Sequence, residues 1–400
     1  MATLTYRTAG ESHGKAILSL VEGLPAGVPV DLDLINNELK RRQGGYGRGG
    51  RQKIEDDKAE FLTGVRMGRT IGSPVTMLIP NRDYRLDDPT ATPPLHRPRP
   101  GHADLAGSIK WLTTDCRETL ERASARETAA RVAAGALARC LLRQFQIDVI
   151  GFVRAVGDVT ASIPELDDPT APPLNYERYV ALLSRRDASD VYCPDEAASG
   201  RFRDFITRMK QDKDTAGGIV EAWVFGCPPG LGSCMTWDAR LDSRLAAAVM
   251  AIQAFKGVEI GLGFECARRP GSQVHDEIAF NPALRDTPSL GFVRKTNNAG
   301  GLEGGMTNGQ PVIVRGAMKP ISTLGKPLMS VDLNTKEPRE AGWERSDISA
   351  IAAASVIVEN VVAFEIARAL VEKFGGDSLT EMRQNFDAFL SLARRLPLDT

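Results

Sequence analysis

The feature that most constrains the fold is a long apolar segment near the C-terminus, "DISAIAAASVIVENVVAFEIARALVEKF", from Asp347 to Phe374. It ends at Gly375 and Gly376, a composition typical of a helix C-terminus. Apolar residues cover nearly all sides of this helix over its first half, whereas a surface helix keeps one polar face. We therefore expect the helix to lie in the interior, between two layers of structure.

The rest of the chain alternates short β-rich segments with Ala-rich helices. A second helix is expected to start after Asp33 and to stop at Gly44, and a third to start near Asp242 and to stop at Gly257. The pattern does not distinguish between different two-sheet arrangements. Enrichment in Val and Ile predicts five strands: Ala16–Gly23, Pro74–Pro80, Asp148–Gly157, Gly217–Gly226 and Gln310–Met318.

Composition narrows the function classes. The 400 residues carry a formal net charge of −1, which gives no general reason to expect binding to nucleic acid or to an anionic membrane. No segment has the pattern of a signal peptide or a membrane span, so we expect a soluble cytoplasmic protein. The six cysteines are scattered without metal-ligand spacing, and we expect free buried thiols and no metal site.

The first segment with anion-binding character is "RRQGGYGRGGRQK", Arg41–Lys53. Its glycines allow close backbone approach to an anion, and its arginines supply charge-assisted hydrogen bonds. This combination favours a phosphate or carboxylate site. Two alternatives stay open, namely a solvated loop and an RNA-binding tract through Arg41–Arg51.

Two further segments have a similar character. In Glu121–Leu142, the spacing of Ser124 and Glu127 is that of a capping box, which predicts a helix start and either an anion site or an ordinary cap. In Asn297–Thr323, five glycines within 300–309 predict that the backbone passes close to a bulky partner or forms a hairpin with a bulge. Lys319 follows, before hydroxyl-bearing residues suited to a phosphate.

Candidate acid–base residues are few. His13 and His102 each adjoin a glycine, and two such histidines suggest a pair of proton-transferring groups in one cleft. We expect His96 and His275 to be surface residues. Asp347, at the mouth of the buried helix, is either an N-cap or a catalytic residue.

Three long motifs together carry a resemblance to a known family. They are "GESHGKAILSLVEGLP" (Gly10–Pro25), "ERASARETAARVAAGAL" (Glu121–Leu137) and "RSDISAIAAASVIVENV" (Arg345–Val361). In this order, and with the segments between them, they resemble the chorismate synthase family over residues 6–380. The motif positions depart from the usual family pattern at Ile348 and at Trp111.

The resemblance implies an enzyme that converts 5-enolpyruvylshikimate 3-phosphate into chorismate and phosphate by a trans-1,4 elimination. This lyase reaction is the last shared step of aromatic biosynthesis, and it needs reduced FMN although it is redox neutral overall. An external flavin reductase would supply the reduced FMN. The alternative is a bifunctional form that reduces FMN with NADPH.

The resemblance also implies roles for individual residues. His13 would protonate the leaving phosphate, His102 would protonate the reduced flavin, and Asp347 would help a flavin nitrogen take up the C6 proton. Arg42 and Arg48 would contact the substrate or the reduced pyridine nucleotide (NADP site). The implied FMN contacts are Arg122, Ala123, Ser124, Gln253, Ala254, Gly304, Lys319, Pro320, Ile321, Ser322, Thr323 and Arg345.

The implied fold is α+β, a single-domain β-α-β sandwich over residues 1–400 with buried helices between antiparallel sheets. The implied assembly is a homotetramer. The Pro-rich segment 81–107 is expected to be a mobile active-site loop. The polar stretch 158–214 is expected to be a peripheral, insertion-like region.

Overall fold

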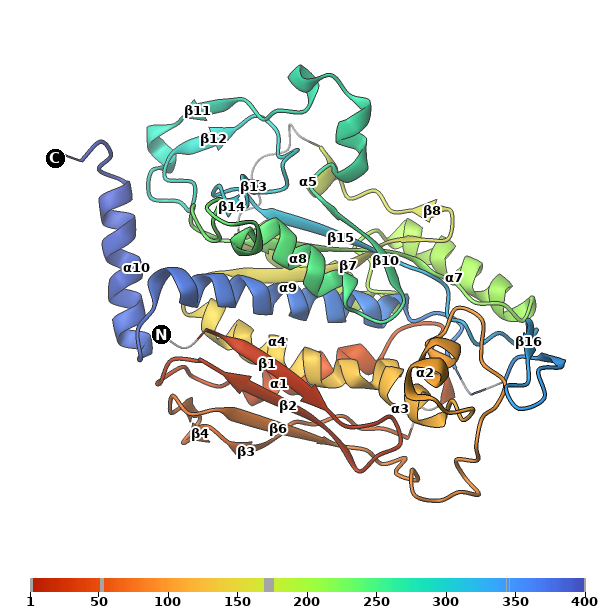
Figure 1. Cartoon of the computed structure of the whole chain (residues 1–400). Helices are drawn as coiled ribbons and strands as arrows, with labels where there is room; N and C mark the ends of the chain where they lie inside the picture. The colour runs from red at the N-terminus through yellow and green to blue at the C-terminus, as the bar shows by residue number, and fades with distance from the viewer. Residues whose placement is uncertain (1–2, 51–53, 169–175, 343, 345, 399–400) are drawn as a thin grey trace.

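The computed structural model describes residues 3–50, 54–168, 176–342, 344 and 346–398. Within these ranges, antiparallel sheets combined with helices confirm the predicted α+β class (Figure 1). The first sheet lies near the N-terminus, and alternate residues of its second strand, Ile17, Ser19 and Val21, are buried. Its strand order is β1 (Thr5–Ala9), β2 (Ala16–Glu22), β6 (Val75–Pro80) and β3 (Glu60–Thr63).

The second sheet is antiparallel throughout and is covered on both faces of its central strands. Ile150 and Phe152 pack with Leu182 on one face, while Val149 and Val153 belong to the main core on the other. All five predicted strand segments are confirmed, with ends that shift by at most two residues. The strand order is β10 (Phe255–Ile260), β15 (Val312–Met318), β9 (Gly218–Phe225), β7 (Asp148–Val156) and β8 (Val159–Thr160).

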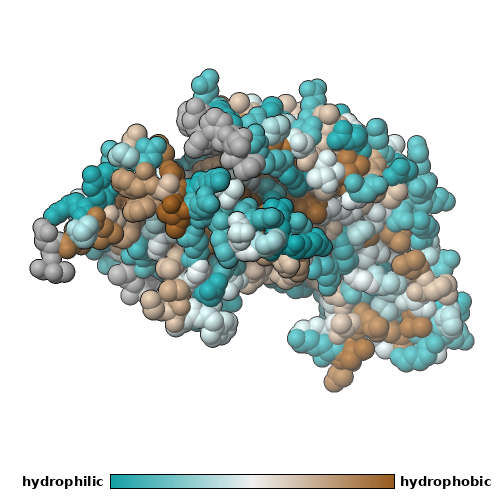
Figure 2. Space-filling view, turned by 90° about the horizontal axis from the view of Figure 1, so that it is seen from above, coloured by the Kyte–Doolittle hydropathy of each residue, from teal (hydrophilic) through white to brown (hydrophobic). Residues whose placement is uncertain are grey.

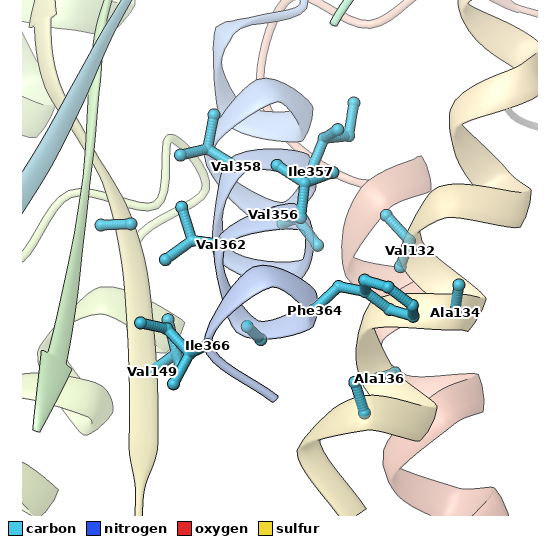
Figure 3. Packing of buried hydrophobic residues seen from close by; sticks show 14 of the residues in the cluster. Val132, Ala134, Ala136, Val149, Val356, Ile357, Val358, Val362, Phe364 and Ile366 are labelled. Carbon is cyan, nitrogen blue, oxygen red and sulfur yellow. The ribbon is translucent and has the colours of Figure 1, made fainter. Parts of the chain in front are cut away.

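The predicted interior helix is α9, Ile351–Phe374, and its burial is confirmed. Val358, Val362 and Ile366 point toward β7, and Phe364 points toward helix α4 (Figure 3). The helix begins later than predicted, and Ala350 precedes it without a side-chain cap. The N-cap interpretation of Asp347 is therefore wrong, because this residue lies outside the helix.

Two more helices share the layer of α9 between the sheets (Figure 1). Helix α4, Thr128–Arg143, contacts both α9 and β2. A Cβ added at its Gly135 would lie 2.2 Å from the backbone oxygen of Asn360, so the two helices approach closely at this glycine. Helix α1, Leu32–Gln43, starts earlier than predicted because Asp31 caps it, and it ends before Gly44 as predicted.

The helix predicted to run to Gly257 is shorter. Helix α8 covers Leu241–Met250, and Ala254 has a left-handed φ of 70° that is incompatible with helix continuation. Phe255 instead pairs with Met318 at the start of β10. Backbone pairing with β15 thus overrides the helical tendency of this segment.

The described part of region 158–214 carries helices, and residues 81–103 contain no helix or strand. All six cysteines are free, but the predicted burial is wrong for Cys234 and Cys266, which are exposed. The remaining helices are α2 (Asp104–Trp111), α3 (Arg117–Ala123), α5 (Pro164–Asp167), α6 (Tyr176–Ala188), α7 (Glu196–Gln211) and α10 (Leu379–Ala393). The two-stranded hairpins are β4 (Val65–Arg66) with β5 (Arg69–Thr70), β11 (Ile278–Phe280) with β12 (Phe292–Arg294), β13 (Leu302–Glu303) with β14 (Met306–Thr307), and β16 (Met329–Val331) with β17 (Pro338–Glu340).

The surface mixes hydrophilic residues with separate hydrophobic patches (Figure 2). Met235, Trp237 and Phe264 are among its most exposed large apolar side chains. Over the part of the chain that the structure describes, no helix combines the length and apolar character needed to cross a membrane.

An ionic cluster lies inside the helical layer, where the sequence predicted only apolar packing. Glu359 of α9 is fully buried and forms ion pairs with Arg41, Arg139 and Arg186 at 3.1, 2.8 and 3.0 Å. Glu38 of α1 is buried too, and burial by itself raises its pKa. The positive charges of Arg41 and Arg139 outweigh this effect and hold the pKa of Glu38 well below its ordinary value. Helices α1, α4, α6 and α9 are thereby joined by charge as well as by apolar contact.

Candidate functional site

A cavity of about 490 Å³ lies where both sheets and the helical layer contribute chain ends and loops. Its lining comes from the β1–β2 turn, the end of α1, the loop before α2 and the α3–α4 junction. The α8–β10 junction, the end of β15 and the start of α9 complete it. The predicted residues that line it are His13, Arg42, Arg48, His102, Ala123, Ser124, Gln253, Ala254, Lys319, Ile321, Ser322, Thr323 and Asp347.

His13 is buried and fixed by two parts of the chain. Its Nδ1 lies 2.9 Å from Oε1 of Glu121, whose Oε2 accepts a hydrogen bond from the His13 backbone N–H at 2.8 Å. The side-chain amide of Asn81 donates to the backbone oxygens of Ser12 and Gly14 on either side. Burial raises the pKa of Glu121, but hydrogen bonds from His13 outweigh it, and the pKa is lowered. The imidazole is therefore held in place by a buried carboxylate.

His102 has a matching arrangement at another part of the cavity lining. Its Nδ1 lies 2.5 Å from Oδ1 of Asp104. The Asp104 side chain is fully buried, and its Oδ2 accepts a hydrogen bond from Nε of Arg99 at 2.8 Å. Burial raises the pKa of Asp104, but hydrogen bonds from His102 and Arg99 hold it well below its ordinary value. Arg99 in turn donates to Thr323 Oγ1 at 3.1 Å, which ties the histidine loop to the segment after β15.

Arg42 is a buried residue whose guanidinium is bound by the protein itself. Its Nε donates to Thr128 Oγ1 at 3.0 Å, and Nη1 donates to Asp57 at 3.2 Å. Asp57 also accepts from Arg126 at 2.6 Å. Burial lowers the pKa of Arg42 to about 10, because the attraction of Asp57 only partly opposes burial and the repulsion from Arg126 and Arg48. These arginines contribute positive charge to the cavity wall in a fixed geometry.

Arg48 and Asp347 meet at the cavity although 299 positions separate them in the sequence. Nη1 of Arg48 donates to Oδ2 of Asp347 at 2.6 Å, and the backbone N–H of Gly49 donates to Oδ1 at 2.5 Å. Nε of Arg48 is buried without a hydrogen-bond partner among the described residues. The glycine- and arginine-rich loop thus fixes Asp347 and keeps one uncommitted donor.

The capping box predicted at Ser124 is wrong in detail. Ser124 ends α3 and caps a short 3₁₀ turn at Ala125–Glu127 by accepting from the backbone N–H of Arg126. Glu127 does not reach back to the cap. Its carboxylate instead accepts hydrogen bonds from the side chains of Thr8 and Gln253, which lie far from it in the sequence.

The segment after β15 and the α8–β10 junction supply the next part of the lining. Burial and the nearby charge of Lys256 lower the pKa of Lys319, whose contact with its own neighbour Pro320 is long at 3.5 Å. Oε1 of Gln253 is buried and lacks a hydrogen-bond partner among the described residues. An ammonium group and an unpaired acceptor on the same cavity fit a ligand with both anionic and N–H groups.

Four predicted contacts are not placed at the cavity. Arg122 is exposed and donates to the backbone oxygens of Thr8 and Gly10. Gly304 lies in the β13–β14 turn, where Cys234 is the nearest neighbour of an added Cβ. Pro320 is exposed beside the lining residues, and Arg345 lies outside the described residues.

The positions of the arginines argue against the RNA-binding alternative. Arg41, Arg42 and Arg48 all point inward, with side chains 15, 5 and 10% exposed. Each is ion-paired with a carboxylate of the chain, whereas a nucleic-acid tract presents its arginines to solvent. Arg51 lies outside the described residues.

Several site residues were missed by sequence reasoning. Asp104 had a local signal, since it follows His102 by two positions. Glu121, Asp57 and Asn81 had none, because their partners lie far away in the sequence, 108 positions away for Glu121 and His13. Only the tertiary structure brings these groups together.

Comparisons with known proteins identify the family of this chain. The sequence profile described as chorismate synthase matches residues 4–371. A chorismate synthase of Symbiobacterium thermophilum is 52% identical over 410 residues, which cover 98% of this chain and 100% of that protein. One of Geobacter metallireducens is 52% identical over 401 residues, with 98 and 99% covered.

A solved structure described as the crystal structure of chorismate synthase superposes with a TM-score of 0.78. It is 40% identical, and the match covers 98% of this chain and 99% of that chain. The profile, the relatives and the structure therefore give the same answer: the chain belongs to the chorismate synthase family.

Proposed function

We propose that the cavity is where this chain, a chorismate synthase and hence a lyase of aromatic biosynthesis, carries out its reaction. The substrate is 5-enolpyruvylshikimate 3-phosphate, and the products are chorismate and phosphate. The observation that carries the proposal is the shared geometry of His13 and His102. Each ring has Nδ1 against a buried carboxylate, and both residues line one cavity among arginines.

The substrate's phosphate and two carboxylates require fixed positive charge. Arg48 and Lys319 are suited to bind these groups. Arg48 keeps a buried N–H donor without a partner among the described residues, and Lys319 has a pKa that is lowered chiefly by burial. A bound anion would raise the pKa of Lys319 back toward its ordinary value. Arg42 and Arg126 act by their charge from the wall, because Asp57 already holds both guanidinium groups.

The cavity residues also fit reduced FMN. Gln253 offers a buried oxygen without a partner, Ser124 offers a hydroxyl, and the backbone of 321–323 follows Lys319 along the lining. When bound, reduced FMN would supply electron density to the breaking C–O bond and recover it afterwards. NADPH as a direct reductant and an external flavin reductase remain alternative sources of the reduced cofactor.

The two histidines act as proton donors in this proposal. With Glu121 on Nδ1, His13 presents Nε2 toward the cavity and delivers a proton to the leaving phosphate. With Asp104 on Nδ1, His102 would protonate the reduced flavin. Asp347, fixed by Arg48 and Gly49, would help a flavin nitrogen take up the C6 proton.

The test is an anaerobic assay with purified protein, dithionite-reduced FMN and 5-enolpyruvylshikimate 3-phosphate. We expect chorismate absorbance and released phosphate in equal amounts, and no product when FMN stays oxidised. Flavin binding without product would reject the reaction for this chain. NADPH consumption without an added reductase, measured in parallel, would identify the bifunctional form.

The remaining features of the proposal concern organisation. We infer a single-domain sandwich, a mobile loop at 81–107 and a cytoplasmic homotetramer. Exposed apolar side chains such as Met235, Trp237 and Phe264 support an assembly, because a monomer would leave them in water. Light scattering of the purified protein gives the mass, and a monomer in solution would reject the tetramer.

A further inference from the structure

The second ring nitrogen of His13 contacts a pair of charged side chains that neither the motifs nor the reaction chemistry pointed to. Nη2 of Arg85 lies 3.2 Å from Nε2 of His13, and Oδ2 of Asp83 lies 3.6 Å from the same atom. Both side chains line the cavity. They come from the beginning of the loop that precedes α2.

This loop and the His13 turn are joined through the backbone. The N–H groups of Arg85 and Leu86 both donate to the carbonyl oxygen of His13, at 3.1 and 3.0 Å. Asn81, at the start of the same loop, binds the residues on either side of His13. The backbone of Arg85 is thus fixed relative to that of His13, and the Arg85 side chain lines the cavity.

The guanidinium of Arg85 is only partly satisfied. Its Nε is buried and makes no hydrogen bond to the described residues, although Asp83 Oδ1 lies 3.4 Å away. Guanidinium groups bind phosphate through two parallel N–H donors, and Nε with Nη2 form such a pair. Arg85 therefore has the donor geometry for a phosphate next to His13.

The contact between Arg85 and His13 has a chemical consequence. Arginine only donates, so Nε2 of His13 must accept through its lone pair, and the ring proton sits on Nδ1 toward Glu121. An Nε2 that accepts from Arg85 carries no proton for a leaving group. A phosphate that draws the guanidinium away frees this atom. Charged groups near the pair include Asp83, and Arg117 lies 3.7 Å from the carboxylate of Glu121.

We propose that Arg85 binds the substrate phosphate and exchanges its contact with His13 for that anion. Nε2 then takes a proton from solvent and gives it to a phosphate oxygen as the C–O bond breaks, after which solvent restores it. This inference rests on the proposed function and adds a phosphate-binding residue to it. It makes proton delivery depend on the presence of the phosphate itself.

The experiment compares Arg85→Gln and Arg85→Lys with Arg82→Gln as the matched control. Arg82 belongs to the same loop, but its side chain is 59% exposed and pairs with Asp56. Binding of inorganic phosphate is measured by ³¹P NMR line broadening, which needs no turnover. Steady-state assays with the substrate give KM and kcat, and thermal unfolding checks that each variant is folded.

For Arg85→Gln we expect phosphate affinity to fall about tenfold and KM to rise by a similar factor, because one charge-assisted contact is lost. Arg85→Lys should recover part of the phosphate affinity, and Arg82→Gln should match the wild type. Wild-type phosphate affinity in Arg85→Gln overturns the inference. If Arg85→Gln fails to fold, unchanged phosphate affinity in Arg85→Lys, or no phosphate binding by the wild type, overturns it as well.

The proposed function and the role of Arg85 can be rejected independently of each other. A wild type that binds phosphate but makes no chorismate rejects the proposed function, while the NMR comparison still decides the role of Arg85. A wild type that makes chorismate while all variants bind phosphate equally rejects only the role of Arg85.

Discussion

Replacing Gly135 by alanine tests how tightly α4 and α9 pack in the helical layer. An ideal Cβ at this position would lie 2.2 Å from the backbone oxygen of Asn360, 2.5 Å from its carbonyl carbon and 2.6 Å from its Cβ. Two of these three atoms are backbone, so no side chain can rotate away. The helices must separate instead, by about 1 Å in a core that is packed as densely as an organic crystal.

The magnitude follows from two opposing terms. Alanine in place of glycine favours a helix interior by about 1 kcal/mol. Overpacking of a well-packed core typically costs about 1–3 kcal/mol, and the backbone contacts place this site at the upper end. Displacement of α9 would also strain the ion pairs of Glu359, the neighbour of Asn360. We expect a net loss of about 2 kcal/mol of unfolding free energy.

The assay is thermal unfolding of the wild type, Gly135→Ala and a matched control, Gly200→Ala. At about 2 cal/mol/K per residue of unfolding entropy, a loss of about 2 kcal/mol lowers Tm by about 2–3 °C. Gly200 also lies within a helix, α7, but an added Cβ there has no atom within 4 Å. Its replacement should leave Tm unchanged or raise it slightly. A Gly135→Ala protein as stable as the wild type would refute the close approach of the helices.

Three further predictions concern the cavity. His13→Ala and His102→Ala should each lower turnover by about 10²-fold or more while the far-ultraviolet circular dichroism stays native, and normal turnover in either removes that residue from the mechanism. Arg48→Ala should raise the substrate KM strongly, since a cationic donor at the cavity is lost, and an unchanged KM in steady-state assays would contradict this role. The lowered pKa of Glu121 means that its carboxylate stabilises the fold above its ordinary pKa and that this stabilisation disappears as pH falls through the folded-state pKa. The Tm difference between wild type and Glu121→Gln should therefore shrink on acidification below about pH 4.5, and a constant difference would show that the hydrogen bonds from His13 to this carboxylate contribute nothing.

Local chemistry explains which elements were predicted correctly. The five strands and helix α9 have strong apolar patterns, and their positions are confirmed apart from the later start of α9. The end of α8 was misplaced because "AIQAFKG" is compatible with both a helix and a strand. Pairing of Phe255 with Met318 decided between them, and this contact joins distant parts of the chain.

The sequence by itself determined the family, the buried central helix and part of the cavity lining, because long motifs and apolar periodicity are local properties. Only the tertiary structure decided the partners of those residues, such as Glu121 for His13 and Asp347 for Arg48. It also decided that Arg41 and Glu359 form a buried ionic cluster, although neither charge fits an apolar core. The physical reason is that a charge is stabilised by whatever surrounds it in space, and a linear pattern records only its neighbours along the chain.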